Sequence, residues 1–235
     1  METKEILFYD IRKFSQSQFL NGLHLLPEDE QKYVLKFQRP SDRLRCLAGK
    51  IMVRSAISKR LGIPFEELDF AKTEFGKPYL VNDLKTHFNL SHSGDFVVVC
   101  IDETNVGVDI ERIDNLPVEG IVDMFSQNEI DFIKSDGSTF DLERFFRVWT
   151  LKESFLKYMG KGLSLDLKTI EFYITKSKIA HVIDSDLLAY DKNFYFNQLE
   201  LTNDYIISVC REYKTKEKLQ EFYFNGECDE EYLFE

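Results

Sequence analysis

The segment V-G-V-D-I-E-R at residues 106–112 restricts the possible fold more than any other part of the chain. Side chains alternate between the two faces of a strand, so the apolar side chains share one face and Gly107, Asp109 and Glu111 share the other. The pattern predicts a strand whose apolar face packs in a core. Two carboxylates on one face repel each other unless a positive group lies between them. The second face is therefore either solvated or built around a cation.

A second segment, R-V-W-T-L-K-E-S-F-L-K at residues 147–157, has helical spacing. Trp149, Glu153 and Lys157 lie four residues apart and therefore line one stripe of a helix. If Glu153 and Lys157 face the strand, they add a third carboxylate and an ammonium group to its pair. Mg²⁺ suits such a site, because it binds one or two protein carboxylates and completes its shell with water and phosphate oxygens. The alternative is a solvated strand face and a surface ion pair worth about 0.3–0.5 kcal/mol. We interpret Trp149 as a core aromatic residue that fixes the helix.

Length and charge limit the class of protein. With 235 residues, 43% of them hydrophobic, the chain can form one large domain or two small ones with a complete core. The net charge of -11 argues against a nucleic-acid partner. Positive charge is nevertheless concentrated in residues 31–60, where nine basic residues oppose Asp42 alone. This basic segment is either the site of an anionic ligand or a helix with a solvated basic face.

The cysteines and the first residues indicate the compartment. The four cysteines contain no C-x-x-C pair, which favours reduced thiols in a cytoplasmic protein over disulfides or a zinc site. The first nine residues contain no long apolar run, so we expect no secretion signal and no membrane partner.

Hydrophobic periodicity and turn residues predict an α/β (α+β) chain whose second half roughly repeats the first. In each half, a short helix and a long helix stopped by glycine precede strands. A capping box at Ser126 and Glu129 opens the short helix of the second half. A turn at residues 102–105 is expected to join two strands as a hairpin. The other expected helices are residues 15–25, 27–37, 42–61 (capped by Pro40 and Ser41) and a long helix that follows residues 138–140 and runs through Met159. The expected strands are residues 5–9, 68–73, 87–90, 96–101, 106–112, 169–174, 194–201 and 205–210.

The predicted organisation is two similar lobes in one chain. Each lobe is a small sheet packed against a long helix, and a pseudo-twofold axis relates the two. We expect residues 1–113 to form the N-terminal lobe, with the D-x-E strand at its end, and residues 114–235 to form the C-terminal lobe. The charged residues 214–220 are expected to begin a loosely attached tail.

Five motifs occur together in one order. They are F-G-K-P at residues 75–78, N-L-S-H-S-G at 89–94, V-G-V-D-I-E at 106–111, W-T-L-K-E-S-F-L-K at 149–157 and G-K-G-L at 160–163. With these motifs the chain closely resembles the 4'-phosphopantetheinyl transferases of the type that activates peptide synthetases (surfactin type), over about residues 36–163. The resemblance implies a two-lobed enzyme that moves phosphopantetheine from coenzyme A to a serine hydroxyl of an apo acyl or peptidyl carrier protein. Adenosine 3',5'-bisphosphate is the implied by-product.

The resemblance also implies roles for individual residues. It makes Asp109, Glu111 and Glu153 ligands of Mg²⁺, and it makes Glu153 and Lys157 catalytic, with Lys157 near the transferred phosphate. Glu153 would act as the base, either directly or through a metal-bound water. His92 is expected near the 3'-phosphate of coenzyme A. The full set of implied coenzyme A contacts is Lys77, Ser91, His92, Arg39, Arg43, Arg45 and Lys157.

Other functions remain open at this stage. A non-catalytic coenzyme A or nucleotide-binding regulatory module would keep the fold but would lack one of the carboxylates. A magnesium-dependent phosphodiesterase would use the same carboxylates with water as the acceptor. We expect a cytoplasmic monomer that resembles a dimer of its own lobes. The carrier protein is expected to dock on the apolar segment 116–125 rather than on the basic segment 31–60.

Overall fold

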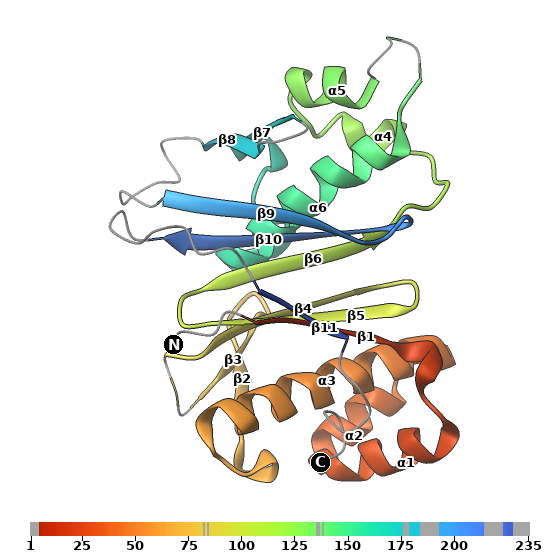
Figure 1. The fold of residues 1–235 in the computed structure, drawn as a ribbon, viewed down its shortest axis with the longest axis vertical. Helices are drawn as coiled ribbons and strands as arrows, with labels where there is room; N and C mark the ends of the chain where they lie inside the picture. Colours follow the sequence, from red (N-terminus) through yellow and green to blue (C-terminus); the bar gives the residue numbers. More distant parts are fainter. Residues whose placement is uncertain are drawn as a thin grey trace. The chain divides into compact units, whose positions relative to one another are not determined.

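The computed structural model describes residues 5–81, 83, 85–134, 137, 139–175, 179–183, 193–213 and 223–227. The chain divides into two compact units. Unit 1 contains Met1–Thr104 together with Phe222–Glu235, and unit 2 contains Asn105–Glu221. In each unit a small sheet packs against a long helix (Figure 1), which confirms the predicted mixed α/β class and its two lobes.

The main sheet of unit 1 has the strand order β11-β1-β5-β4. β5 runs antiparallel to both β1 and β4, and all its residues are buried, as its continuous apolar run predicts. β11 pairs in parallel with β1, so the chain returns to unit 1 after it has formed unit 2. The bounds are β1 Glu5–Asp10, β4 His87–Ser93, β5 Phe96–Asp102 and β11 Tyr223–Glu227.

The described residues of unit 1 contain three α-helices besides two short 3-10 turns. Figure 1 draws the α-helices in red to orange. They are α1 Gln16–Leu25, α2 Glu28–Leu35 and α3 Pro40–Leu61. The apolar stripe of α3 packs on β4 and β5 and supplies much of the core. Gly62 ends α3 in the left-handed conformation (φ 66°), which glycine adopts without a steric penalty. A separate hairpin, β2 Phe70–Lys72 and β3 Pro78–Leu80, completes the described part of this unit.

The main sheet of unit 2 has the order β6-β10-β9, and a second hairpin pairs β7 with β8. The long helix α6 packs along β6 and β10. Asp141 caps its first turn and Gly160 ends it in the left-handed conformation, as Gly62 does for α3. No helix in the described residues has the length and apolar character needed to cross a bilayer. The bounds are β6 Val106–Arg112, α4 Glu119–Val122, α5 Gln127–Lys134, α6 Leu142–Met159, β7 Ile170–Ile174, β8 Ile179–Ile183, β9 Asn193–Thr202 and β10 Tyr205–Tyr213.

The prediction that β5 and β6 form a hairpin is wrong. β1 and β4 occupy both edges of β5, and β6 pairs instead with β10, about a hundred residues further along the chain. This pairing places β6 in unit 2, so the units divide between Thr104 and Asn105 rather than after residue 113.

The strand expected at residues 87–90 continues through Ser93. Arg39, not the predicted Ser41, is the N-cap of α3, and Pro40 takes the first helical position. The charged residues 214–220 lie outside the described part of the chain.

Candidate active site

The strand β6 and the helix α6 approach each other closely at Gly107. A Cβ atom at this position would lie 2.0 Å from the backbone oxygen of Ser154 and 2.4 Å from the backbone nitrogen of Tyr158. Only a residue without a side chain allows this approach. The strand face that carries Gly107 and Asp109 therefore faces α6, and Asp109 is 3% exposed. This burial contradicts the alternative of a solvated strand face.

An ion pair joins the two elements. The Nζ atom of Lys157 on α6 donates to Oδ1 of Asp109 on β6 at 2.6 Å. Glu153 lies one helical turn before Lys157, on the same stripe. The structure thus brings Asp109, Glu153 and Lys157 together, and Glu111 follows two residues after Asp109 on the same strand face.

The pKa of Glu153 reflects its burial and the charged side chains around it. Burial and the negative charge of Asp109 raise the pKa of Glu153 to about 7, against the opposing effect of Lys157 and with a further contribution from Glu111. The charges of Asp109 and Glu111 both act on Glu153, and the one ammonium group of Lys157 only partly balances the three carboxylates. The donor set fits a hard divalent cation with oxygen ligands. In the described residues, however, no three His, Cys, Asp or Glu side chains are already arranged to hold a metal ion.

Trp149 belongs to the core of unit 2 rather than to the carboxylate cluster. Its ring stacks on Phe145, with centroids 6.1 Å apart and planes 13° apart, and it also contacts Phe125. The interpretation of Trp149 as a core aromatic residue is confirmed. The capping box at Ser126 and Glu129 is also confirmed, with both of its hydrogen bonds present.

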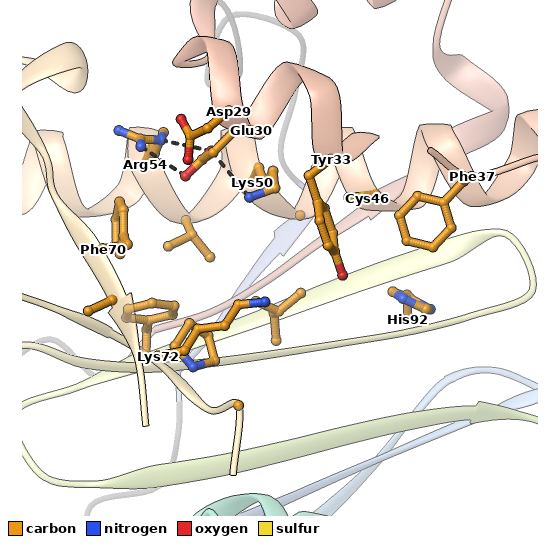
Figure 2. A pocket seen from close by; sticks show the side chains of 17 residues that line it. Asp29, Glu30, Tyr33, Phe37, Cys46, Lys50, Arg54, Phe70, Lys72 and His92 are labelled. Atoms are coloured by element: carbon orange, nitrogen blue, oxygen red, sulfur yellow. Dashed lines mark hydrogen bonds and ion pairs between the residues drawn. The ribbon is translucent and has the colours of Figure 1, made fainter. Parts of the chain in front are cut away.

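A pocket of about 470 Å³ lies within unit 1 and is lined by residues of α2, α3, the β2–β3 hairpin and β4. Figure 2 shows the ring of Tyr33 near its centre, with Lys50 and Lys72 on one side and His92 on the other. The ammonium groups lie 5.5 Å (Lys50) and 5.1 Å (Lys72) from the centroid of this ring. Phe88 forms part of the apolar lining. An aromatic ring beside several cations suits a nucleotide, which offers a flat base and phosphate groups.

Two carboxylates that line the same pocket, those of Asp29 and Glu30, partly balance these cations. Glu30 accepts from buried Arg54 at 3.0 Å and lies 3.3 Å from Lys50. Arg54 also donates to two backbone oxygens, those of Phe65 and Leu68, which identifies it as a structural residue. In the described part of the chain, no salt bridge engages Lys72. The pocket therefore keeps an excess of positive charge for an anionic ligand.

The predicted coenzyme A contacts are distributed unevenly around this pocket. His92 lines it, and Lys77 lies between two lining residues, Gly76 and Pro78. Ser91 is 6% exposed and belongs to β4 beside His92. The three arginines do not line the pocket. Arg39 is exposed at the N-cap of α3. The side chain of Arg43 donates to the backbone oxygen of Phe37, and that of Arg45 contacts Asp42 and the backbone oxygen of Gly94.

No sequence motif singled out Tyr33, Lys50 or Lys72 as a ligand contact. A signal was present, because Glu30 and Tyr33 are three residues apart and therefore lie on one face of α2, and Phe37 follows four residues later, just after the helix ends. Lys50 also belongs to the basic segment 31–60, but the composition of that segment does not reveal which face of α3 lines the pocket.

Known proteins resemble this chain over both units. A family model described as 4'-phosphopantetheinyl transferase, N-terminal, matches residues 13–104, and the model of the 4'-phosphopantetheinyl transferase superfamily matches residues 105–210. The gsp 4'-phosphopantetheinyl transferase of Aneurinibacillus migulanus is 32% identical over 180 residues, which cover 76% of this chain and 74% of the relative. The Sfp 4'-phosphopantetheinyl transferase of Bacillus subtilis (strain 168) is 31% identical over 159 residues, or 68% and 71% of the two chains. The L-aminoadipate-semialdehyde dehydrogenase-phosphopantetheinyl transferase of Mus musculus is 28% identical over 216 residues, or 83% and 70%.

The chain therefore belongs to the 4'-phosphopantetheinyl transferases, of the type represented by Sfp and gsp. It is an enzyme, and its reaction is the transfer of phosphopantetheine to a carrier protein. The boundary between the two family models, at residues 104 and 105, coincides with the boundary between the two structural units.

Proposed function

We propose that this transferase takes phosphopantetheine from coenzyme A, with Mg²⁺ held by Asp109, Glu111 and Glu153, and attaches it to a serine hydroxyl of an apo acyl or peptidyl carrier protein. The observation that carries the proposal is the cluster of Asp109, Glu153 and Lys157 between β6 and α6, in which the pKa of Glu153 is raised to about 7. Burial and the negative charge of Asp109 raise this pKa, and a cation would offset the repulsion between the two carboxylates.

In the proposed reaction, the serine oxygen forms a bond to the β-phosphorus of coenzyme A while the bond to adenosine 3',5'-bisphosphate breaks. The bound ion would neutralise charge on the diphosphate during the transfer. Lys157 would stabilise the transferred phosphate, and its ion pair with Asp109 holds the ammonium group in place. Glu153 would accept the serine proton, either directly or through a water molecule held at the site. We keep the transfer through water as a route because a carboxylate that also binds a cation is a weaker base.

The pocket of unit 1 is proposed to bind the nucleotide end of coenzyme A. Tyr33 offers an aromatic face for adenine, and Lys50, Lys72 and His92 offer positive or hydrogen-bonding groups for phosphate oxygens. We retain Lys77 as a contact because its two neighbours line the pocket. The remaining proposed contacts depend on the resemblance alone, and they are Ser91, Arg39, Arg43 and Arg45.

The carrier protein is proposed to dock on the apolar segment 116–125. Val118, Val122 and Phe125 in this segment are buried and therefore belong to the core of unit 2. Met124 is 42% exposed, which makes it the best candidate contact. We further propose that the protein acts as a monomer in the cytoplasm. Within the described part of the chain, Cys46, Cys100 and Cys210 form no disulfide, which agrees with a reducing compartment.

A single assay tests the proposed reaction. The protein is incubated with coenzyme A, Mg²⁺ and an apo carrier protein, and mass spectrometry follows both carrier and coenzyme A. We expect the carrier to gain one phosphopantetheine group, and we expect excess chelator to abolish the gain. Hydrolysis of coenzyme A without a modified carrier would instead identify a phosphodiesterase. Binding of coenzyme A without any turnover would identify a regulatory module.

A further inference from the structure

A fully buried charged pair lies on a different face of α6 from Glu153. Lys152 has no exposed surface, and its Nζ atom donates to the backbone oxygens of Leu167 at 2.7 Å and Ile170 at 2.6 Å. The same atom lies 2.9 Å from Oε1 of Glu129, whose side chain is also fully buried. The ammonium group therefore has three acceptors from three different segments.

Glu129 is engaged just as completely. Its Oε1 atom also accepts from the backbone nitrogen of Phe172 at 2.9 Å. Its Oε2 atom accepts from the backbone nitrogen of Ser126 at 2.9 Å, which closes the capping box of α5. The pair thus ties α5, β7, the turn before β7 and α6 together at one point inside unit 2.

Stability alone is a poor explanation for this pair. Removing two charges from water costs several kcal/mol per ion, and well-packed apolar residues of the same volume often stabilise a core equally well or better. What a hydrogen-bonded pair supplies, and an apolar pair does not, is directional contacts that permit one arrangement of the elements. The role of the pair is therefore to be sought in the elements that its contacts hold in position.

Lys152 directly precedes Glu153. Successive side chains leave an α-helix about 100° apart, so Lys152 points toward α5 and β7 while Glu153 lies on the stripe that pairs with β6. On the β6 side, the close approach at Gly107 limits how near α6 can come. The hydroxyls of Thr150 and Ser208 are 2.7 Å apart and link α6 to β10. The Lys152 contacts hold α6 from the opposite side and so limit its rotation and sliding.

We propose that the Glu129–Lys152 pair is a positioning device that sets the rotation and height of α6 and thereby places Glu153 and Lys157 for the transfer. The inference rests on the proposed function, because it assumes that Glu153 and Lys157 act in the reaction. Small displacements at such a site are costly, since about 1 Å of misplacement lowers a rate by about 10²-fold.

The decisive experiment separates stability from positioning. Lys152→Met alone leaves the carboxylate of Glu129 buried without its counter-ion, so we expect a lowered melting temperature and lowered activity. The double variant Lys152→Met/Glu129→Gln removes both charges and keeps an acceptor for Phe172. We expect it to recover most of the melting temperature, while kcat stays about 10–100-fold below wild type. Calorimetry should show weaker Mg²⁺ binding to the double variant, with the affinity for coenzyme A unchanged.

Two further variants keep the test decisive if the double variant folds poorly. Glu129→Gln alone preserves shape and should raise the Mg²⁺ dissociation constant and lower kcat several-fold. Glu171→Gln is the matched control, because Glu171 also joins α5 to β7, through Ser126 and Asn128, but is only half-buried. Its charge acts on Lys152 through space, and the hydrogen bonds described for it include none to α6. We expect wild-type kcat and Mg²⁺ binding from this control.

The outcomes distinguish the inference from the proposed function. Wild-type kcat and Mg²⁺ binding in Glu129→Gln, or equal losses in Glu171→Gln, would overturn the inference and leave the function intact. A wild-type protein that transfers nothing, yet binds Mg²⁺ more tightly than Glu129→Gln does, would reject the function and support the positioning role.

Discussion

Substituting Glu153 by glutamine tests the carboxylate cluster without any assay of transfer. The pKa of Glu153 is raised from its ordinary value of 4.5 to about 7, mainly by burial and by the charge of Asp109. Below pH 4.5 the carboxyl group is protonated in both the folded and the unfolded chain, so it adds no pH dependence. Between pH 4.5 and 7 the unfolded chain loses the proton while the folded chain keeps it, so the free energy of unfolding falls as pH rises.

The size of the effect follows from the same numbers. A tenfold change in an ionisation constant corresponds to about 1.4 kcal/mol, so the rise from 4.5 to about 7 sets a ceiling of about 3 kcal/mol. Glu153 is partly exposed, and solvent screening reduces the effect. We therefore expect Glu153→Gln to be more stable than wild type by about 1–2 kcal/mol at pH 8 in chelator, and by almost nothing at pH 5.

Urea unfolding at pH 5, 6, 7 and 8 measures this difference. Glu143→Gln is the control, because Glu143 lies on the same helix but is exposed and pairs with Arg147 at the surface. Adding Mg²⁺ at pH 8 should then stabilise the wild type by about 1.4 kcal/mol at tenfold excess over its dissociation constant, and should not stabilise Glu153→Gln. A pH-independent difference between the two proteins would refute the clustering of carboxylates. Equal stabilisation of both by Mg²⁺ would refute the metal assignment.

Four other predictions concern separate parts of the molecule. Gly107→Ala should cost about 3 kcal/mol in denaturant unfolding because its methyl group would overlap the backbone of α6, whereas Gly120→Ala, which meets nothing within 4 Å, should be harmless; equal stabilities would contradict the close approach. Asp109→Asn should lower turnover by about 10²–10³-fold, the scale expected for one electrostatic contact, and undiminished wild-type activity in excess chelator would contradict a role for metal. His92→Ala should weaken coenzyme A binding far more than 3'-dephospho-coenzyme A binding in calorimetry, and equal losses would remove His92 from the 3'-phosphate. Met124→Asp should raise the Michaelis constant for the carrier without changing the affinity for coenzyme A. The wild-type Michaelis constant for the carrier should change little with salt concentration. A steep salt dependence of this constant, together with an unchanged constant in Met124→Asp, would assign docking to the basic segment 31–60.

Much of the architecture follows from periodicity. The two long helices end at Gly62 and Gly160 as predicted, and the apolar run of β5 forms the buried centre of its sheet. Pairing was harder to predict, because β6 is apolar enough to neighbour either β5 or β10, and local sequence does not choose between them. The chain resolves this by long-range packing against α6, which only Gly107 permits.

The candidate site could likewise be predicted only in part. Spacing alone placed Asp109 and Glu153 where they could meet, but by itself it favoured a solvated strand face, and the family motifs reversed that interpretation. The burial of Lys152 is a feature that the sequence does not reveal. A lysine beside a glutamate in a helix is typical of a solvent-exposed face, yet this one is fully buried and engaged with Glu129. Helical spacing cannot reveal a buried partner that lies more than twenty residues earlier in the chain.

The parallel pairing of β11 with β1 has a consequence for how the protein is made. Unit 1 begins at the start of the chain but gains its edge strand from residues 223–227, after all of unit 2 has been synthesised. Until then β1 presents an open edge, the kind of surface on which strands of other chains can add. A fragment cut at residues 13–104 would lack both β1 and β11 and would leave one side of β5 bare. Unit 1 therefore cannot be obtained intact by a single cut, and its completion during biosynthesis has to wait for the last part of the chain.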